Sequence, residues 1–200
     1  MQLLGELQFI ANAMWPDIAF VINQLASYIA NPSLQHMTAL KRILWYLSET
    51  HEYEITYKNI PDATPKFKGY ADAAFADRED FKSTTGYVFV AAGGVITWKS
   101  NKQLLMAQSS TKAKYITFWE AGKETLWLRN FYYKLGFEQN LPTLIFFDNT
   151  GAIEIAKNPL YHKRTKHMDI KLHWVWEKVK EGCFYPVKCH TTEQTANVLT

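Results

Sequence analysis

The stretch that decides the fold runs from residue 69 to residue 103: GYADAAFADREDFKSTTGYVFVAAGGVITWKSNKQ. Together with Phe67 and Lys68 it contains three segments of alternating or apolar character, and the last two meet at Gly93-Gly94. Such segments, separated by turn-forming residues, are typical of β-strands, and a short Gly-containing link favours a hairpin. The stretch therefore predicts three consecutive antiparallel strands.

The residues that follow alternate between helical and strand patterns. A long helix is predicted from about Ser110 to Leu135, ended by Gly136. Then come a short apolar strand (141–148), two helices (149–158 and 164–182), a strand (183–189) and the start of a last helix (191–199). Strand–helix alternation adds parallel strands to a sheet. We therefore expect an α/β fold with a mixed five-stranded sheet flanked by helices.

The first sixty residues have a different character. Apolar residues recur at helical spacing within 18–29 and again within 34–47, with Ser33 a plausible N-cap of the second run. Residues 51–58 alternate and predict a strand, and the loop 59–65 contains two prolines. We therefore expect a helical segment (1–60) followed by an α/β domain (61–200).

Composition limits the class of protein without deciding it. Of the 200 residues 48% are hydrophobic, which is ample for a packed core, and a net charge of +3 permits a nucleic-acid partner without requiring one. Cys183 and Cys189 would lie about 20 Å apart in an extended strand, too far for a disulfide. We expect free thiols, no signal peptide, no membrane span, and hence an intracellular protein, cytoplasmic or nuclear.

Two aspartates are the first candidates for chemistry. Asp72 lies in the first strand of the α/β domain, and Asp148 ends the fourth strand immediately before a helix. Carboxylates at the ends of adjacent strands can share a Mg²⁺ ion, because this cation prefers oxygen ligands. The alternative is that each aspartate only caps a turn or a helix.

Several motifs together resemble one family. The opening stretch, SSTKAKYI (109–116), FFDNTGAIEIAKNP (146–159), HKRTKHMDIKLHW (162–174) and TTEQTANVL (191–199) are similar in order and spacing to the ribonuclease H domain of copia-type LTR retrotransposon polyproteins. Residues 15–47 resemble the connection segment that joins reverse transcriptase to that domain. The resemblance implies a ribonuclease H-like fold, and an ancestral activity that cuts RNA in RNA–DNA hybrids with Mg²⁺ ions held by four carboxylates.

Carried over by position, the resemblance matches two of the four acids to Asp72 and Asp148. The family has Ser-Ser-Thr-Glu-Ala-Glu-Tyr where this chain has Lys112 and Lys114, and the second glutamate is a metal ligand. Its last acid is replaced by Asn197. Lys114 lies on the core-facing stripe of the predicted helix, so its ammonium should point toward the aspartates and weaken Mg²⁺ binding or abolish it. Asp169 matches a further acid of the family. We interpret it as a structural residue, and the alternative is a spare metal ligand.

Basic and polar residues form the candidate nucleic-acid contacts. A phosphate backbone could be held by Lys99, Asn101, Lys102, Lys163, Arg164, Lys166 and His167. The alternative for the second group is a solvated loop.

Three functions remain open at this point. The first is a catalytically impaired ribonuclease H-like domain that still binds RNA–DNA hybrid or other nucleic acid. The second is a residually active metal-dependent ribonuclease H. The third is a repurposed protein-interaction module, whose N-terminal helices, once packed against reverse transcriptase, could now favour self-association.

Overall fold

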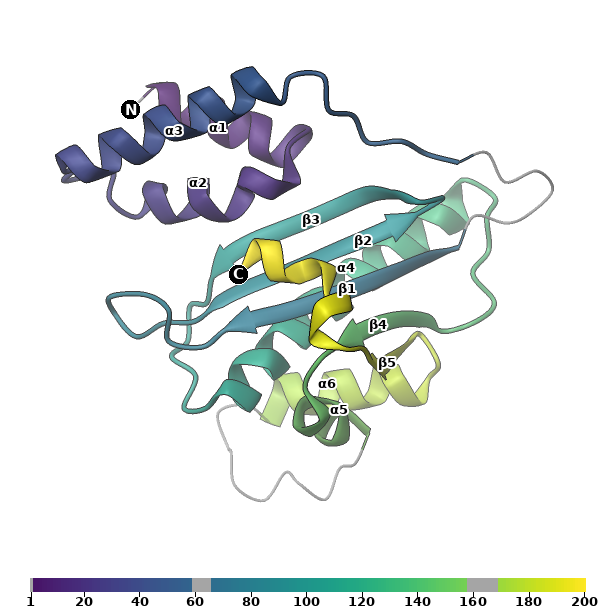
Figure 1. Ribbon diagram of the computed structural model, residues 1–200. Coiled ribbons are helices and arrows are strands. Elements are labelled where there is room, and N and C mark those ends of the chain that lie inside the picture. The colour runs from purple at the N-terminus through teal and green to yellow at the C-terminus, as the bar shows by residue number, and fades with distance from the viewer. Residues whose placement is uncertain (1, 59–65, 158–168) are drawn as a thin grey trace.

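The computed structural model describes residues 2–58, 66–157 and 169–200. Its centre is a five-stranded sheet in the order β3-β2-β1-β4-β5 (Figure 1). The first three strands are antiparallel neighbours, and β4 and β5 add in parallel to β1. This confirms the mixed five-stranded sheet predicted from the sequence. The strands are β1 (Phe67–Ala74), β2 (Thr84–Ala91), β3 (Gly94–Lys102), β4 (Thr143–Phe147) and β5 (Phe184–Lys188).

Helices precede the sheet and cover both of its faces. In the described parts of the chain, three α-helices lie before the first strand and three lie after the third. The α-helices are α1 (Gln2–Ala13), α2 (Ala19–Ala26), α3 (Leu34–Glu49), α4 (Ser110–Lys134), α5 (Thr150–Lys157) and α6 (Asp169–Lys180), and 3-10 turns occur at η1 (Pro16–Ile18), η3 (Thr191–Glu193) and η4 (Thr195–Leu199). No helix in the described parts of the chain is long and apolar enough to cross a membrane.

Local signals fix where the principal helices begin and end. The side chain of Ser109 accepts a hydrogen bond from the backbone N–H of Lys112, which satisfies one of the free donors at the start of α4. Ser33 caps α3 in the same way, as predicted. After α4, Gly136 adopts φ 85°, a left-handed conformation that glycine reaches without steric cost. The predicted N-cap Ser33 and the predicted stop Gly136 therefore take the roles expected of them.

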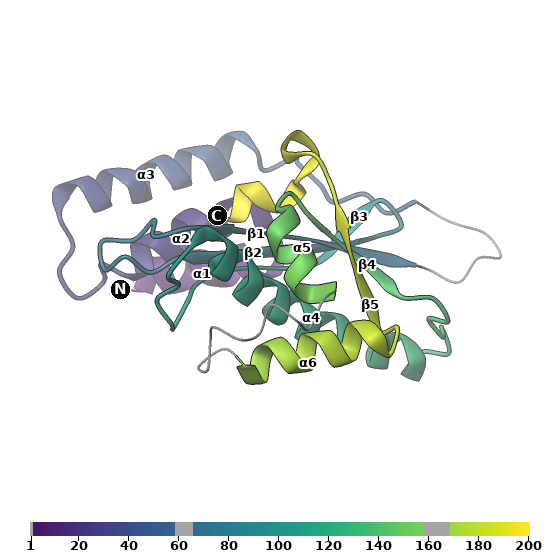
Figure 2. The ribbon, with the colours of Figure 1, turned by 90° about the horizontal axis from the view of Figure 1, so that it is seen from below.

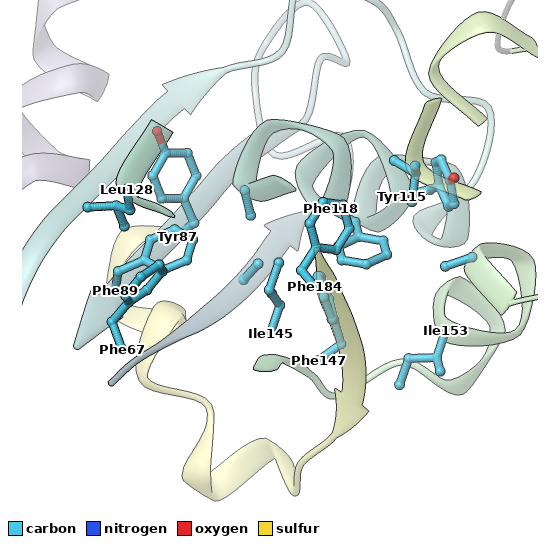
Figure 3. Packing of buried hydrophobic residues seen from close by; sticks show 14 of the residues in the cluster. Phe67, Tyr87, Phe89, Tyr115, Phe118, Leu128, Ile145, Phe147, Ile153 and Phe184 are labelled. Atoms are coloured by element: carbon cyan, nitrogen blue, oxygen red, sulfur yellow. The ribbon is translucent and has the colours of Figure 1, made fainter. Parts of the chain in front are cut away.

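The main core lies between the sheet and helices α4, α5 and α6. Alternate residues of β2 point to this face, among them Tyr87 and Phe89, because side chains alternate along a strand. Figure 3 shows them beside Phe67 and Leu128, while Phe118 of α4 and Phe184 of β5 lie together further along the same core. The ring of Phe118 meets that of Phe147 edge to face at 4.7 Å, a favourable geometry for aromatic pairs. This packing fixes α4 against the sheet and so fixes Lys114.

The opposite face of the sheet is covered by the N-terminal helices and the C-terminal segment (Figures 1 and 2). Val88, between the two core-facing residues of β2, packs with Ile22 of α2 and Leu199 of η4. The indole N–H of Trp98 on β3 donates to the carbonyl of Ala11 on α1 at 2.8 Å. The helical segment and the sheet thus share one hydrophobic cluster. The proposed boundary, 59–65, lies outside the described residues, and the division at residue 60 stays a prediction.

Two predicted elements are wrong. Residues 51–58 form no strand, because a single backbone hydrogen bond, from Lys58 N–H to the Ala92 carbonyl, joins this segment to the β2–β3 turn. The predicted last helix is two 3-10 turns, η3 and η4, separated by Gln194 in an extended conformation. The side chain of Gln194 bonds to the sheet, and this tertiary contact prevails over a continuous helix.

Candidate functional site

Strand register brings the two predicted aspartates together. In the parallel pair β1–β4, Tyr70 stands opposite Phe146, and their rings stack with centroids 5.1 Å apart. Asp72 and Asp148 each follow two residues later. Since side chains two residues apart point to the same face, the two carboxylates emerge side by side just beyond the paired part of β1 and β4. Asp148 also lies two residues before α5, as the sequence predicted.

Lys114 of α4 lies between the two carboxylates. Its Nζ atom forms an ion pair with Oδ1 of Asp72 at 3.0 Å, and it donates a close hydrogen bond to Oδ1 of Asp148. Each of the three side chains is exposed by only 12–14%. The prediction that Lys114 points toward the aspartates is confirmed by this geometry.

The electrostatics of the site depend on this lysine. Burial by itself would lower the pKa of Lys114, because it disfavours the charged form. The hydrogen bond to Asp148 and the negative charge of Asp72 act in the opposite direction and prevail, so the pKa of Lys114 is raised. The ammonium therefore stays charged at neutral pH and neutralises much of the negative charge of the pair.

Two residues that sequence reasoning missed complete the site. Thr200 donates from Oγ1 to Oδ2 of Asp72 at 3.1 Å. Gln194, 4% exposed, donates from Nε2 to the carbonyls of Ala71 (3.1 Å) and Phe146 (3.2 Å). These carbonyls lie where the β1–β4 ladder ends, one residue before Asp72 and two residues before Asp148. Gln194 therefore joins the two strands at the point where they diverge. A glutamine inside a polar C-terminal stretch carries no local signal of such a contact.

The other predicted residues lie further out or outside the description. Asn197 is exposed, and its side-chain amide donates to the carbonyl of Thr191. Its backbone carbonyl accepts a hydrogen bond at 3.3 Å from Thr200 Oγ1, the same hydroxyl that donates to Asp72, so Asn197 is linked to the aspartate pair only through Thr200 among the described hydrogen bonds. Lys163, Arg164, Lys166 and His167 lie outside the described residues. Asp169 begins α6, and its side chain is outside the description as well.

The predicted contacts on β3 gather at one edge of the sheet. Lys102 forms an ion pair with Asp80 at 2.8 Å, and Lys99 lies 3.8 Å from a carboxylate oxygen of Glu120 on α4. Asn101 between them is exposed. Its other neighbour, Ser100, donates to the carbonyl of Leu199 and so holds the C-terminal segment. The basic residues of β3 thus belong to a second group of side chains, which is separate from the aspartate pair.

The donor set at the aspartates does not fit Mg²⁺. The ion needs near-octahedral oxygen ligands at about 2.0–2.1 Å, and here an ammonium group already occupies the space between the two carboxylates. In the described part of the chain, no group of three or more His, Cys, Asp or Glu side chains is placed to hold a metal. Any divalent cation would have to displace Lys114, and no metal-dependent step follows from this arrangement.

Comparison with known proteins agrees with this fold. The chain is 16% identical to the ribonuclease H1 known as LC11, isolated from compost, with a TM-score of 0.51 over 67% of this chain and 91% of that one. A foamy viral protease–reverse transcriptase, solved in complex with an RNA/DNA hybrid, covers 98% of this chain with a TM-score of 0.58 at 14% identity, and 25% of its own chain is matched. The chain therefore has a ribonuclease H-like fold.

Sequence relatives give the family. The chain is 37% identical over 198 residues to the retrovirus-related Pol polyprotein from transposon TNT 1-94 of Nicotiana tabacum, and 35% identical over 199 residues to that of transposon RE1 of Arabidopsis thaliana. No protein-family model matches. The chain belongs to the family of copia-type retrotransposon Pol polyproteins, and it spans 15% and 13% of the length of these two relatives.

A third relative is a secreted effector protein. The secreted RxLR effector protein 161 of Plasmopara viticola is 36% identical over 126 residues, which are 62% of this chain and 87% of that protein.

Proposed function

We propose that the chain is a retrotransposon-derived ribonuclease H-like domain that is catalytically impaired and still binds RNA–DNA hybrid or other nucleic acid. The observation that carries the impairment is the position of Lys114, whose ammonium bridges Asp72 and Asp148. In the family resemblance, Lys114 and Asn197 stand where two metal-binding acids are expected. A cation between the remaining carboxylates repels Mg²⁺ electrostatically and occupies its place.

Retained binding is supported by the fold and by the charge at the β3 edge. Phosphate contacts depend on cations and not on a metal site, so loss of the acids leaves them in place. Lys99, Asn101 and Lys102 remain available at this edge as candidates for backbone contacts. Reverse transcriptase of the ancestral polyprotein is the expected neighbour of the N-terminal helices.

Two measurements on one preparation test this function. Cleavage of a labelled RNA–DNA hybrid in Mg²⁺ or Mn²⁺ should be at background, while fluorescence anisotropy should show salt-dependent binding of the same hybrid. Metal-dependent cleavage that co-purifies with the protein and disappears in Asp72→Asn would instead establish a residually active ribonuclease H. Absence of binding at low salt would remove the nucleic-acid part of the proposal.

A repurposed interaction module is the second candidate. The effector relative matches over most of its own length, which supports a role for such a segment outside a polyprotein. Helix α3 also carries exposed apolar side chains: Leu34 (87%), Met37 (50%) and Trp45 (67%). Exposed apolar groups of this kind favour association with a partner or with a second copy. Light scattering across a concentration series tests self-association, and Trp45→Ser should reduce it if α3 is the contact.

A further inference from the structure

A cavity of about 330 Å³ lies between the edge strand β3 and helix α4, apart from the aspartate pair. Four lysines line it: Lys99 and Lys102 from β3, Lys123 from α4 and Lys171 from α6. The indole of Trp119 forms part of the wall. Three separate elements therefore place cationic groups around one cavity, an arrangement that the sequence order does not reveal.

The lysines of this cavity have too few carboxylate partners. Among the described residues, Glu120 is the only acid in its lining, and it lies 3.8 Å from Lys99 and 3.1 Å from Lys123. Lys102 pairs with Asp80, which belongs to the β1–β2 loop and does not line the cavity. One carboxylate of the lining thus serves several ammonium groups. The cavity keeps an excess of positive charge that an anionic ligand would balance.

Lys171 is a partly buried member of this group of lysines. Burial lowers its pKa, and the positive charge of Lys123 adds to this, against the attraction of Glu120. Both ammonium groups lie over the ring of Trp119, at 3.7 Å for Lys123 and 4.0 Å for Lys171 from its centroid. A cation–π contact holds an ammonium in position against the ring. Each ammonium has three N–H donors, so donors are left for a ligand even though Lys123 also pairs with Glu120.

The cavity lies at the same end of the sheet as the aspartates. Asp72 stands opposite Gly86 in β2, and Gly86 stands opposite Ser100 in β3, the neighbour of Asn101. Two strand spacings of about 4.8 Å place this part of β3 roughly 10 Å from Asp72. A nucleic-acid strand that passes the aspartates can reach the cavity within a few nucleotides, since a duplex rises about 3.4 Å per nucleotide along each strand.

We propose that this cavity binds a phosphate group of the nucleic-acid backbone, held by Lys123 and Lys171 with Lys99, Asn101 and Lys102 at its rim. Clustered ammonium groups are suited to the charge of a phosphate, and the volume leaves room for part of the attached sugar. The inference rests on the proposed function, because the phosphate is taken to belong to bound nucleic acid. A free phosphorylated small molecule offers the same chemistry and is distinguished below.

The test compares two double variants of the full chain with equal loss of charge. Lys123→Gln with Lys171→Gln removes the pocket cations, and Lys41→Gln with Lys134→Gln removes two exposed lysines elsewhere. Binding of an RNA–DNA hybrid is followed by anisotropy from 50 to 200 mM salt. The pocket variant should lose about tenfold or more in affinity and lower the salt slope by about one per lost phosphate contact, while the control changes little.

A second measurement tests the chemistry at the cavity directly. Inorganic phosphate and pyrophosphate are titrated while the indole N–H signal of Trp119 is followed by NMR, assigned with Trp119→Phe. The signal should move in the wild type and not in the pocket variant, and hybrid should displace pyrophosphate. If pyrophosphate binds and hybrid does not displace it, the phosphate site stands and its ligand is a free phosphorylated molecule.

Two outcomes separate this inference from the proposed function. If both double variants bind hybrid alike and the Trp119 signal does not respond to pyrophosphate, the phosphate pocket is overturned while nucleic-acid binding remains. If the wild type binds pyrophosphate at the cavity but no nucleic acid, the proposed function fails and the anion site survives it.

Discussion

The Nζ atom of Lys114 lies 3.0 Å from Oδ1 of Asp72. The two residues are 42 positions apart in the chain, and the fold brings them together from helix α4 and strand β1. Asp148 accepts a hydrogen bond from the same ammonium. Three charged groups from β1, α4 and the end of β4 therefore form a compact cluster that needs no metal ion. The predictions below test what this cluster does for stability and for chemistry.

Stability should not depend on divalent metal. The ammonium already balances one of the two negative charges and occupies the space between the carboxylates, so we expect no preferred Mg²⁺ site in the folded state, and a ligand that does not bind the folded state adds no stability. The melting temperature should be the same in EDTA as in Mg²⁺, and it should not change when the Mg²⁺ concentration is raised about tenfold. A clear rise with Mg²⁺, or Mg²⁺ affinity in the millimolar range or better by titration, would contradict this.

Replacement of Lys114 should destabilise the fold. Removing one partner of a buried ion pair leaves an uncompensated charge and costs about 3–5 kcal/mol, and for this partly exposed cluster we expect about 1–3 kcal/mol. Urea unfolding of Lys114→Met measures the loss, and added Mg²⁺ should recover part of it. Lys112→Met, two residues away with its ammonium on Gln108, is the control and should change stability little. Equal effects of both variants would refute the role given to Lys114.

The contribution of Lys114 should depend on pH in one direction. Its pKa in the folded protein is raised above the ordinary value of 10.5. A group whose pKa is higher in the folded than in the unfolded state stabilises fully below the unfolded pKa and loses that contribution as pH rises through the folded pKa. The difference in unfolding free energy between wild type and Lys114→Met should thus be constant near neutral pH and shrink above about pH 10.5. A difference that grows with alkaline pH would have the wrong sign.

Restoring the acids should restore chemistry only as a pair. Lys114→Glu together with Asn197→Asp should return metal-dependent cleavage of an RNA–DNA hybrid, while either change alone should do little, since ligands of one site act as a unit. At position 197 a carboxylate can no longer donate to the Thr191 carbonyl, which frees that side chain from its present contact.

Lys112→Glu with Asn197→Asp is the matched control for this reversion and should stay inactive. If the double revertant binds hybrid and metal yet does not cut, the assignment of the missing acids is incomplete.

Gln194 should act as a positioning residue for the cluster. Gln194→Ala leaves the carbonyls of Ala71 and Phe146 without their donor, which should cost about 1–3 kcal/mol. It should also let β1 and β4 separate and bring the pKa of Lys114, followed by NMR of its side chain, back toward the ordinary value. Ile22→Ala, in the other hydrophobic cluster, should destabilise the protein without moving the Lys114 signal. A Lys114 signal that does not move in Gln194→Ala would leave Gln194 with a purely structural role.

Several features of this protein follow from the sequence by itself. The strands and the long helix were predictable because side-chain period and stop residues such as Gly136 are local properties, set by a few adjacent positions. The inward direction of Lys114 was predictable for the same reason, since it shares a helical stripe with Phe118 and Ala121. The family resemblance then supplied the reason to look at Lys114, Asp72 and Asp148 together.

Other features were decided only by the tertiary structure. Residues 51–58 alternate like a strand but find no strand partner, because pairing depends on which backbone lies alongside. Gln194 and Thr200 reach Ala71 and Asp72 across more than 120 positions, and Lys171 meets Trp119 and Lys123 only when α6 packs on α4. Such contacts carry no local pattern, because their energy comes from satisfying buried carbonyls and charges brought together by distant segments.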